Sequence, residues 1–481
     1  MRAIGIDIGT TSICLGVYEE ETGRLSAVRQ EKNHFLEGTF RQDPDRIYAV
    51  VKEMLDNFLQ SDDSTDRPSA IGISSQMHGI LYVDRAGRAV SPYYTWKEES
   101  GNGTFGEETY ASYLSRVTGC EMYTGYGSVT HFTLQQTGQI PAQAVCLANI
   151  GDYIAMRLCD AKEPVMSPSI AASLGGFGLQ ERRFAMEAME RAGVATSYYP
   201  QVRAAGFVLG TYEGIPVTCA QGDNQASFYA AIGEKQDALS VNVGTGSQVS
   251  LFHRELIEGT EAEIRPFTEK GFLYVQASVN GGKVYERLAE FVKGTVFAVT
   301  GIETDVYEKL EEAGAQVPAT DLRITPLLYG SRQRPASDES AKRPAAENLT
   351  LGRNAGRPAP ENLALGRNTG RQAPKNPAPG GSMTGLTAGN FTLGHMVRAY
   401  VAGMALELYR MYEQLPEVLK QGKREIIASG NGIRKNRLLR QEVERLFGLP
   451  VRFRDIEEEA AAGAAMWALA EVKRHEEEER Q

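Results

Sequence analysis

GIDIGTTS, from Gly5 to Ser12, is the stretch that decides the fold. Its apolar, β-branched half enters a glycine turn, and a second apolar run, Ile13 to Tyr18, leaves it. Two such runs joined by a short turn predict a β-hairpin. Half a chain further on, Leu239 to Val243 enters the turn Gly244 to Ser247 and residues 248–252 return, so we expect a second hairpin there.

The two hairpins align position by position, with Ile6 to Ser12 matching Val241 to Ser247. The economical explanation is two structurally related halves, each presenting a strand–turn–strand loop to a shared cleft. The alternative is a chance likeness between two glycine turns. A chain of 481 residues is also too long for one ordinary core. We therefore expect domains at 1–235 and 236–481.

Apolar spacing predicts an α/β pattern in both halves. In the first, Asp43-Pro44-Asp45 has the capping acid and the proline typical of a helix start, and a short strand, Ala70 to Ser74, follows. In the second, we expect a strand over 425–428 and helices over 391–412, 435–447 and 457–472. The last helix is alanine-rich, and its small residues suit close packing on a sheet.

Residues 333–383 differ from the rest of the chain. They are rich in Pro, Gly, Asn and Arg, and they contain a tandem duplication, Glu347 to Pro360 and then Glu361 to Pro374. Two copies cannot build a repeat core, so we expect a mobile surface insertion. The segment is net basic in an acidic protein, which leaves a weak interaction role open.

Composition restricts the class of function. The net charge of −10 argues against a nucleic-acid-binding protein, whose phosphate contacts need a basic surface. The five cysteines form no CxxC pair and no run of about 18 apolar residues occurs, so we expect free thiols, no membrane span and a cytoplasmic protein. The chain has neither GxxxxGK(S/T) nor GxGxxG after a strand, which disfavours P-loop enzymes and dinucleotide-dependent dehydrogenases.

The two turns have the composition of phosphate-binding loops. Glycine lets the backbone approach a ligand closely, and the hydroxyl groups add donors. Asp7, just before the first turn, is suited to hold Mg²⁺ or its waters beside a triphosphate, whereas the aligned Asn242 carries no charge. One loop would then organise metal and the other would cradle phosphate. Alternatively, both are structural hairpin turns.

A carboxylate for proton transfer stands in the run Gln221 to Ser227. Asp223 follows a strand end and precedes a helix start, where it would face a cleft. A kinase acting on an alcohol needs such a base beside the attacking hydroxyl. The alternative is that Asp223 is simply the helix N-cap.

Further candidates for ligand contact lie at other strand ends and loops. Gln76 and His78 end a strand and offer donors and acceptors that suit a polyol, or form a polar turn. Trp96 lies in a loop and would stack on a sugar face or cover the core. Ser429 to Gly432 opens a helix that would receive a nucleotide, or is an ordinary glycine-rich turn.

In their order, these motifs resemble those of the FGGY carbohydrate kinases of the actin/hexokinase/Hsp70-like ATPase superfamily. GIDIGTTS resembles the family's first phosphate loop, NVGTGS its second, and SGNGIRKN its adenosine motif. The resemblance covers nearly the whole chain except the insertion, and GDNQAS with NVGTGSQVS is most similar to the sedoheptulokinase branch. It implies two RNase H-like α/β domains around a central cleft.

The resemblance implies a role for each matching residue. Asp7 would lie at Mg²⁺, and Asp223 would be the general base. The implied ATP contacts are Gly9, Thr10, Thr11, Gly244, Thr245 and Gly246 at phosphate and Gly430 and Asn431 at adenosine. The implied sugar contacts are Gln76, Met77, His78, Trp96, Glu98, Asn224 and Gln225.

The chain departs from the family after the loop tryptophan. Family members usually carry Asp and often Arg there, but here the run is Trp96-Lys97-Glu98-Glu99-Ser100, in which Glu98 would replace the Asp with one more methylene. The insertion likewise replaces a normally short connection after Gly330.

We therefore expect an ATP- and Mg²⁺-dependent kinase that phosphorylates a primary hydroxyl of a ketose, sedoheptulose giving sedoheptulose 7-phosphate. One alternative is a xylulokinase-like pentulose kinase. Another is a non-catalytic, actin-like nucleotide-binding regulatory protein, which would have no need for Asp223 together with Gln76 and His78. The sequence leaves the oligomeric state open, a homodimer included.

Overall fold

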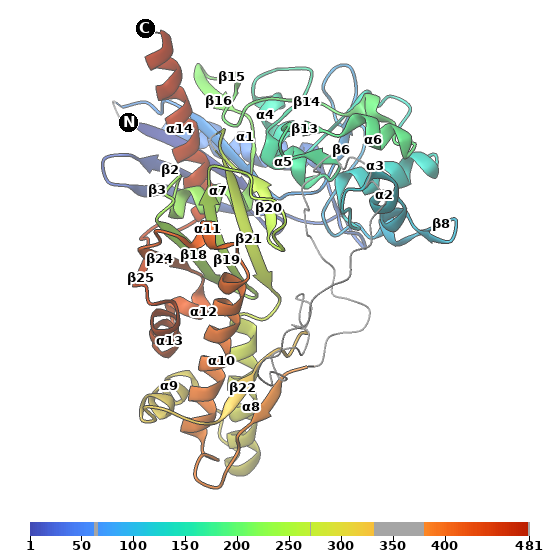
Figure 1. Ribbon diagram of the computed structural model, residues 1–481. Helices are drawn as coiled ribbons and strands as arrows, with labels where there is room; N and C mark the ends of the chain where they lie inside the picture. Colours follow the sequence, from blue (N-terminus) through green and yellow to red (C-terminus); the bar gives the residue numbers. More distant parts are fainter. Residues whose placement is uncertain (62–65, 270, 331–379, 480–481) are drawn as a thin grey trace, which may run out of the picture.

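The computed structural model describes residues 1–61, 66–269, 271–330 and 380–479, and two β-sheets organise them (Figure 1). The first sheet's strands run in the order β15 (Val208–Tyr212), β16 (Ile215–Thr218), β5 (Ile71–Ser75), β1 (Arg2–Ile8), β2 (Ser12–Glu19) and β3 (Arg24–Lys32), and β17 (Gln221–Gly222) also pairs with β5. β1 and β2 form the predicted hairpin, with Asp7 opposite Cys14. β5 runs parallel to β1.

The second sheet repeats this arrangement. Its strands run in the order β20 (Glu263–Pro266), β21 (Phe272–Ser278), β19 (Ser247–His253), β18 (Ala238–Val243), β24 (Glu425–Ser429) and β25 (Val451–Phe453). β18 and β19 form the second predicted hairpin, and β24 runs parallel to β18. The order β3-β2-β1-β5-β16 thus corresponds to β21-β19-β18-β24-β25, with the same antiparallel and parallel pairs. The two halves are structurally related, as the aligned hairpins predict.

Helix α1 (Pro44–Ser61) covers the first sheet, and its start follows the predicted signals. Asp43 Oδ1 accepts the backbone N–H groups of Asp45 and Arg46 at 3.0 and 3.2 Å. Its buried face includes Ile47, Val51 and Leu55, which join the core beneath β1 and β5.

Two helices, α7 (Asp223–Ala231) and α14 (Glu459–Glu479), lie together between the sheets (Figure 1). Although α14 follows the second sheet in sequence, its Ala465 and Leu469 share a core with Ala3 of the first sheet. Phe228 on α7 shares a core with Phe252 of the second sheet. Each half therefore contributes a helix to the core of the other.

Glycines allow this close approach. A Cβ on Gly5 would lie 1.9 Å from the carbonyl oxygen of Ala461 on α14, and one on Gly463 would lie 1.8 Å from that of Ala226 on α7. Both neighbours are backbone atoms. The alanine-rich helix predicted at the end of the chain therefore packs on a sheet, and glycines on β1 and on α14 itself make the contacts possible.

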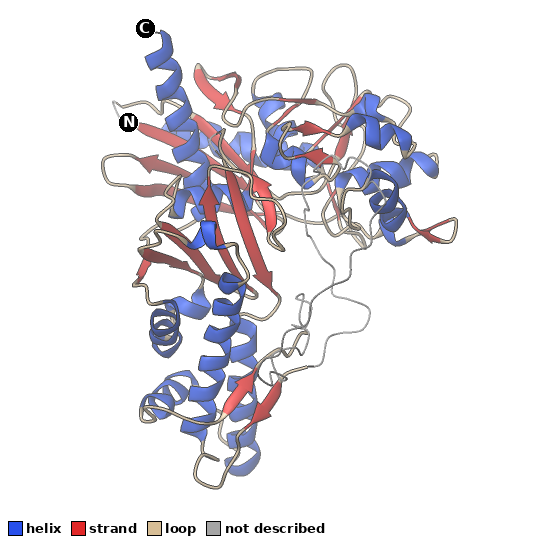
Figure 2. Ribbon diagram, in the orientation of Figure 1, coloured by secondary structure: helices blue, strands red, loops and turns tan. Residues whose placement is uncertain are grey.

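Helices α8 (Gly282–Thr300), α9 (Tyr307–Ala315) and α10 (Leu393–Glu413) gather at the far end of the second domain, beside a short strand pair (Figure 2). The pair is β22 (Arg323–Thr325) and β23 (Ser382–Thr384), which are antiparallel. The predicted insertion, residues 333–383, therefore ends too late, because residues 382–383 already belong to β23. Its remainder up to residue 379, including the duplication, lies outside the described residues.

The last three long helices each begin two residues later than the sequence predicts. Thr392 accepts the N–H of His395 and so begins α10, and Asn436 accepts the N–H of Leu439 and so begins α13 (Arg437–Phe447). A short helix, α12 (Asn431–Arg434), stands between β24 and α13. No helix in the described part of the chain is long and apolar enough to span a membrane.

Candidate active site

Two carboxylates flank β5 at one edge of the first sheet. Asp7 pairs with Ser74 across β1 and β5, and the Ser74 hydroxyl donates to Asp7 Oδ1 at 2.7 Å. On the other side of β5, Gly222 lies opposite Ser75, so Asp223 follows directly at the same edge. Burial and then the charge of Asp223 raise the pKa of Asp7 to about 7. A divalent cation at Asp7 would offset both causes.

Asp223 is the first residue of α7, and Gly222 is the N-cap. The alternative in which Asp223 caps the helix is therefore wrong. Its Oδ1 accepts the backbone N–H of Asn224 at 2.8 Å, while burial raises the pKa of its carboxyl group. A carboxylate that is costly to leave charged is a better proton acceptor than an exposed one.

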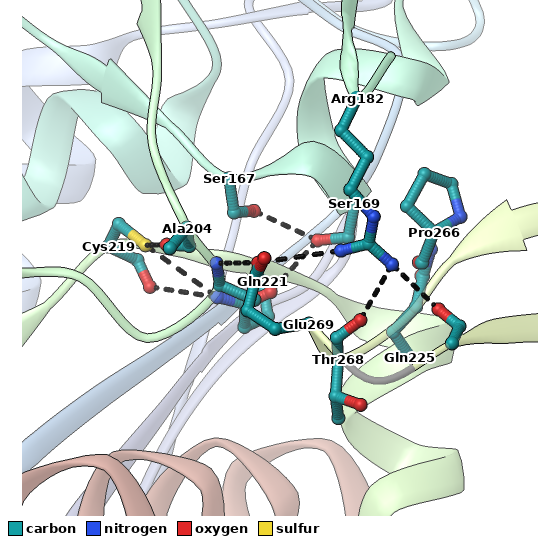
Figure 3. A network of polar contacts seen from close by, with 12 residues as sticks. Ser167, Ser169, Arg182, Ala204, Cys219, Gln221, Gln225, Pro266, Thr268 and Glu269 are labelled. Atoms are coloured by element: carbon teal, nitrogen blue, oxygen red, sulfur yellow. Dashed lines mark hydrogen bonds and ion pairs between the residues drawn. The ribbon is translucent and has the colours of Figure 1, made fainter. Parts of the chain in front are cut away.

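The start of α7 is held by the helix α5 (Pro168–Ser173) and its N-cap Ser167 (Figure 3). Ser169 Oγ accepts the N–H of Gly222 and donates to Gln221 Oε1, each at 3.1 Å. Ser167 Oγ donates to the Ala220 carbonyl at 2.6 Å. These bonds fix the strand end from which Asp223 projects.

Thr10 in the first turn is hydrogen-bonded to two of the expected sugar contacts, Gln76 and Trp96. Its hydroxyl donates to Gln76 Oε1 at 3.2 Å and accepts the indole N–H of Trp96 at 3.0 Å. Its carbonyl accepts from Gln42 Nε2 at 2.8 Å, and Gln42 Oε1 in turn accepts from Gln76 Nε2 at 2.8 Å. Thr10, Gln76 and Trp96, which are distant in sequence, are thus one polar cluster.

The other residues of this turn differ in exposure. Gly9 donates its N–H to the Ser12 carbonyl at 2.9 Å and closes the turn, whereas Thr11 is exposed. Trp96 beside the turn is 46% exposed, and the Lys97 ammonium lies over its ring at 5.2 Å from the centroid. Gln76 is buried, and its amide holds the turn in place.

His78 is neutral at physiological pH. Its Nδ1–H donates to the Ser173 carbonyl at 2.7 Å, which leaves Nε2 as the acceptor nitrogen of the ring. Burial is the main cause that lowers the pKa of His78 to about 4. Its backbone has φ 74°, and its ring stacks on Tyr126 with centroids 4.7 Å apart. The neighbouring Met77 is buried and lies beside Gly222.

The other three polar residues among the expected sugar contacts also have protein partners. Glu98 forms an ion pair with Arg41 at 3.0 Å. Asn224 Nδ2 donates to Gln248 Oε1 at 3.4 Å. Gln225 is fully buried and donates to the carbonyl of Pro266 on β20 at 3.4 Å, so in this conformation it joins the two domains and presents no surface to a ligand.

The second turn forms a backbone cradle with two other glycine segments. Gly282 N–H, at the start of α8, donates to the Gly244 carbonyl at 2.7 Å, and a Cβ on Gly281 would lie 2.0 Å from the Gly246 carbonyl oxygen. Gly430 has φ 84°, and a Cβ there would lie 2.5 Å from the Val243 carbonyl oxygen. Asn431 begins α12 beside it and is exposed, and Thr245 is also exposed.

These features fit ATP and Mg²⁺. Gly281 and Gly430 let their segments pack against the backbone of the second turn, and a Cβ on Gly244 in that turn would meet no atom closer than 3.5 Å, so a ligand can approach its backbone. The described residues contain no group of three or more His, Cys, Asp or Glu side chains that could hold a metal alone. Mg²⁺ at a kinase site is commonly held by one or two carboxylates together with substrate phosphates, which agrees with Asp7 as a single ligand.

Several residues near the site were not predicted from the sequence. Ser74 is recognisable only from its pairing with Asp7, a geometry repeated where Asn242 Nδ2 donates to Ser429 Oγ at 2.7 Å. Gly281 and Gly282 form a Gly-Gly pair before a helix, which a search for phosphate loops could have found. Arg265 on β20 acts electrostatically on Asp223 from the second domain.

Curated relatives match almost the whole chain. The sedoheptulokinase of Mus musculus is 29% identical, covering 97% of this chain and 97% of the mouse protein. The sedoheptulokinase of Homo sapiens is 27% identical, covering 98% and 97%. The gluconokinase of Bacillus subtilis is 22% identical, covering 97% and 86%.

Solved structures share the fold. Gluconate kinase from Lactobacillus acidophilus superposes with a TM-score of 0.72 at 20% identity, covering 98% of this chain and 89% of that one. Xylulose kinase from Rhodospirillum rubrum gives 0.74 at 17% identity, covering 98% and 89%. The models of the N-terminal and C-terminal domains of the FGGY family of carbohydrate kinases match residues 2–230 and 244–472. With an actin/hexokinase-like fold and both domain models matched in order, this chain belongs to the FGGY family of carbohydrate kinases.

Proposed function

We propose that this sugar kinase transfers the γ-phosphate of ATP to a primary hydroxyl of a ketose, and that sedoheptulose is its substrate. The observation that carries the proposal is the pair of half-buried carboxylates on either side of β5, with the glycine turns nearby. Relatives named sedoheptulokinase that match over nearly their whole length support the choice of sugar.

Asp223 acts as the general base in this proposal. Its carboxylate accepts the proton of the primary hydroxyl as that oxygen attacks phosphorus. Its pKa is raised by burial, which brings it closer to the operating pH and improves proton acceptance. The bond to Asn224 N–H orients the carboxylate at the start of α7.

The sugar lies on the first domain in this proposal. Nε2 of neutral His78 accepts a hydrogen bond from a sugar hydroxyl, and the half-exposed Trp96 packs against the sugar. Gln76 and Gln225 act through their neighbours, since both are buried and hydrogen-bonded to protein. We place the boundary between this domain and the nucleotide-side domain near residue 235, between α7 and β18.

The nucleotide lies on the second domain, beside the second turn, where Gly281 and Gly430 pack closely against the backbone of residues 243–246. Exposed Thr11 and Thr245 offer hydroxyl donors from the two turns. Asp7 would hold Mg²⁺, which when bound offsets the negative charge of the phosphate oxygens.

The test is ADP release from ATP and Mg²⁺ with sedoheptulose, xylulose, gluconate, glucose and glycerol. Sedoheptulose should stimulate release most strongly, and Asp223→Ala should lower kcat by about 10²–10⁴-fold while ATP binding persists. Asp455→Ala, at an exposed surface carboxylate, is the matched control and should behave as the parent. Stronger stimulation by xylulose would favour a pentulose kinase, and an active Asp223→Ala would reject the base.

A further inference from the structure

A buried ion pair lies on β20 of the second domain, the strand whose Pro266 carbonyl accepts from Gln225 of the first domain. Arg265 and Glu263 lie two residues apart on β20, so their side chains share a face of the strand, and Arg265 Nε donates to Glu263 Oε1 at 2.7 Å. Their side chains are only 14% and 9% exposed. Burying two charges is costly unless the geometry is good, and such a pair is weak evidence for stability. A role in ligand binding is the better explanation.

The charge of Arg265 acts on groups of the first domain. Its positive charge acts on Asp223, on His78 and on the hydroxyl of Tyr126, which stacks on His78. These are the proposed base and the proposed sugar-side turn, all contributed by the first domain. Glu263 acts on His78 as well. The pair therefore stands across the domain junction from the place where a hydroxyl would approach Asp223.

The first domain holds β20 and its following turn in this position (Figure 3). Gln225, two residues after Asp223, donates to the carbonyl of Pro266, the residue after Arg265, at 3.4 Å. Arg182 donates to the carbonyls of Thr268 and Gly271 at 2.8 and 2.9 Å. One hydrogen bond, from Gln225 to Pro266, therefore connects the backbone next to Asp223 with the backbone next to Arg265.

We propose that the Glu263–Arg265 pair binds hydroxyl groups of an uncharged sugar, holds the chain against Asp223 and disfavours sugars that carry a carboxylate. Guanidinium N–H groups donate in a fixed planar fork, and a carboxylate accepts, so the pair matches neighbouring hydroxyls. Glu263 neutralises Arg265, so a sugar acid gains little attraction there. The discrimination matters because gluconokinases are among the relatives of this chain.

This inference rests on the proposed function, and its test separates the two. Wild-type protein is first assayed for ADP release with sedoheptulose and with gluconate. If neither sugar stimulates release, the proposed function fails and the inference falls with it. If sedoheptulose does, then Arg265→Gln should raise its KM by about 10- to 100-fold, as expected for a lost hydrogen bond to a charged group, with the KM for ATP unchanged.

Glu263→Gln leaves Arg265 with an uncompensated charge, so the ratio of kcat/KM for gluconate to that for sedoheptulose should rise at least about tenfold. If that variant does not fold, the double variant Glu263→Gln with Arg265→Gln has no buried charge, and its sedoheptulose KM should still rise. Arg474→Gln, at an exposed pair on α14, is the matched control. Unchanged sugar KM in folded Arg265→Gln or in the double variant would overturn the inference and leave the kinase assignment intact.

Discussion

Replacing Gly463 with alanine tests whether the contact between α7 and α14 positions the proposed base. The new Cβ would lie 1.8 Å from the carbonyl oxygen of Ala226, 2.5 Å from its carbonyl carbon and 3.2 Å from its Cα. All three are backbone atoms of α7, so no side chain can rotate away. The helices must separate instead.

The size of the separation follows from these distances. Carbon and oxygen rarely approach closer than about 3 Å, so α14 and α7 must move apart by roughly 1 Å or more. Overpacking of this kind costs about 1–3 kcal/mol, and we expect the upper end because both surfaces are rigid. Asp223 lies one helical turn before Ala226, and a misplacement of about 1 Å in a catalytic group can cost about 10²-fold in rate.

The assay combines thermal unfolding with kcat for the stimulating sugar. Gly294→Ala is the matched control, because Gly294 lies inside α8 with nothing within 4 Å of a new Cβ. That change should leave kcat unaltered and stabilise the helix by about 0.5–1 kcal/mol. If Gly463→Ala unfolds at the control's temperature and keeps its kcat, the helix contact does not position Asp223, and the reasoning is refuted.

Two further predictions concern single side chains. His131 accepts from the Tyr82 hydroxyl at Nδ1 and donates from Nε2 to the Ala195 carbonyl, and burial lowers its pKa to about 4. The folded state therefore binds fewer protons than the unfolded state between pH 6.5 and 4, and stability should fall by up to about 3 kcal/mol as pH drops through that window. In His131→Gln this contribution is lost, so the free energy of unfolding should fall less between pH 6.5 and pH 4 than in the parent; an unchanged fall would contradict this. Trp96 is 46% exposed and Trp467 2%, so ATP or sugar should reduce acrylamide quenching in the parent but not in Trp96→Phe. Equal protection in both proteins would place the ligand elsewhere.

The elements that the sequence predicts well are those with local signals. The two hairpins, the cap at Asp43 and the alanine-rich α14 each depend on residues adjacent in the chain or one turn apart. The resemblance also predicts the order of the phosphate and adenosine segments, because each is a contiguous motif. Family membership and the paired-sheet fold could therefore be inferred before any coordinates.

What could not be predicted depends on contacts between distant segments. Nothing around Arg265 signals that β20 reaches Asp223, because its docking depends on Gln225 and Arg182 in the other domain. The burial of Gln225 also depends on this contact between the domains, so it could not be predicted. From the sequence, a polar residue beside the base is expected to contact a ligand. β23 was missed because its partner strand lies on the other side of the insertion.

The position of α14 has a consequence for how the protein is made. The first sheet and α1 leave the ribosome early, but among the described residues the apolar cluster around Ala3 and Ala70 is completed by side chains of α14. Domains generally fold as they emerge, yet this one must wait with an apolar face open until the rest of the chain has been translated. We infer that a nascent chain stopped before Glu459 is a better client for a chaperone than the released protein.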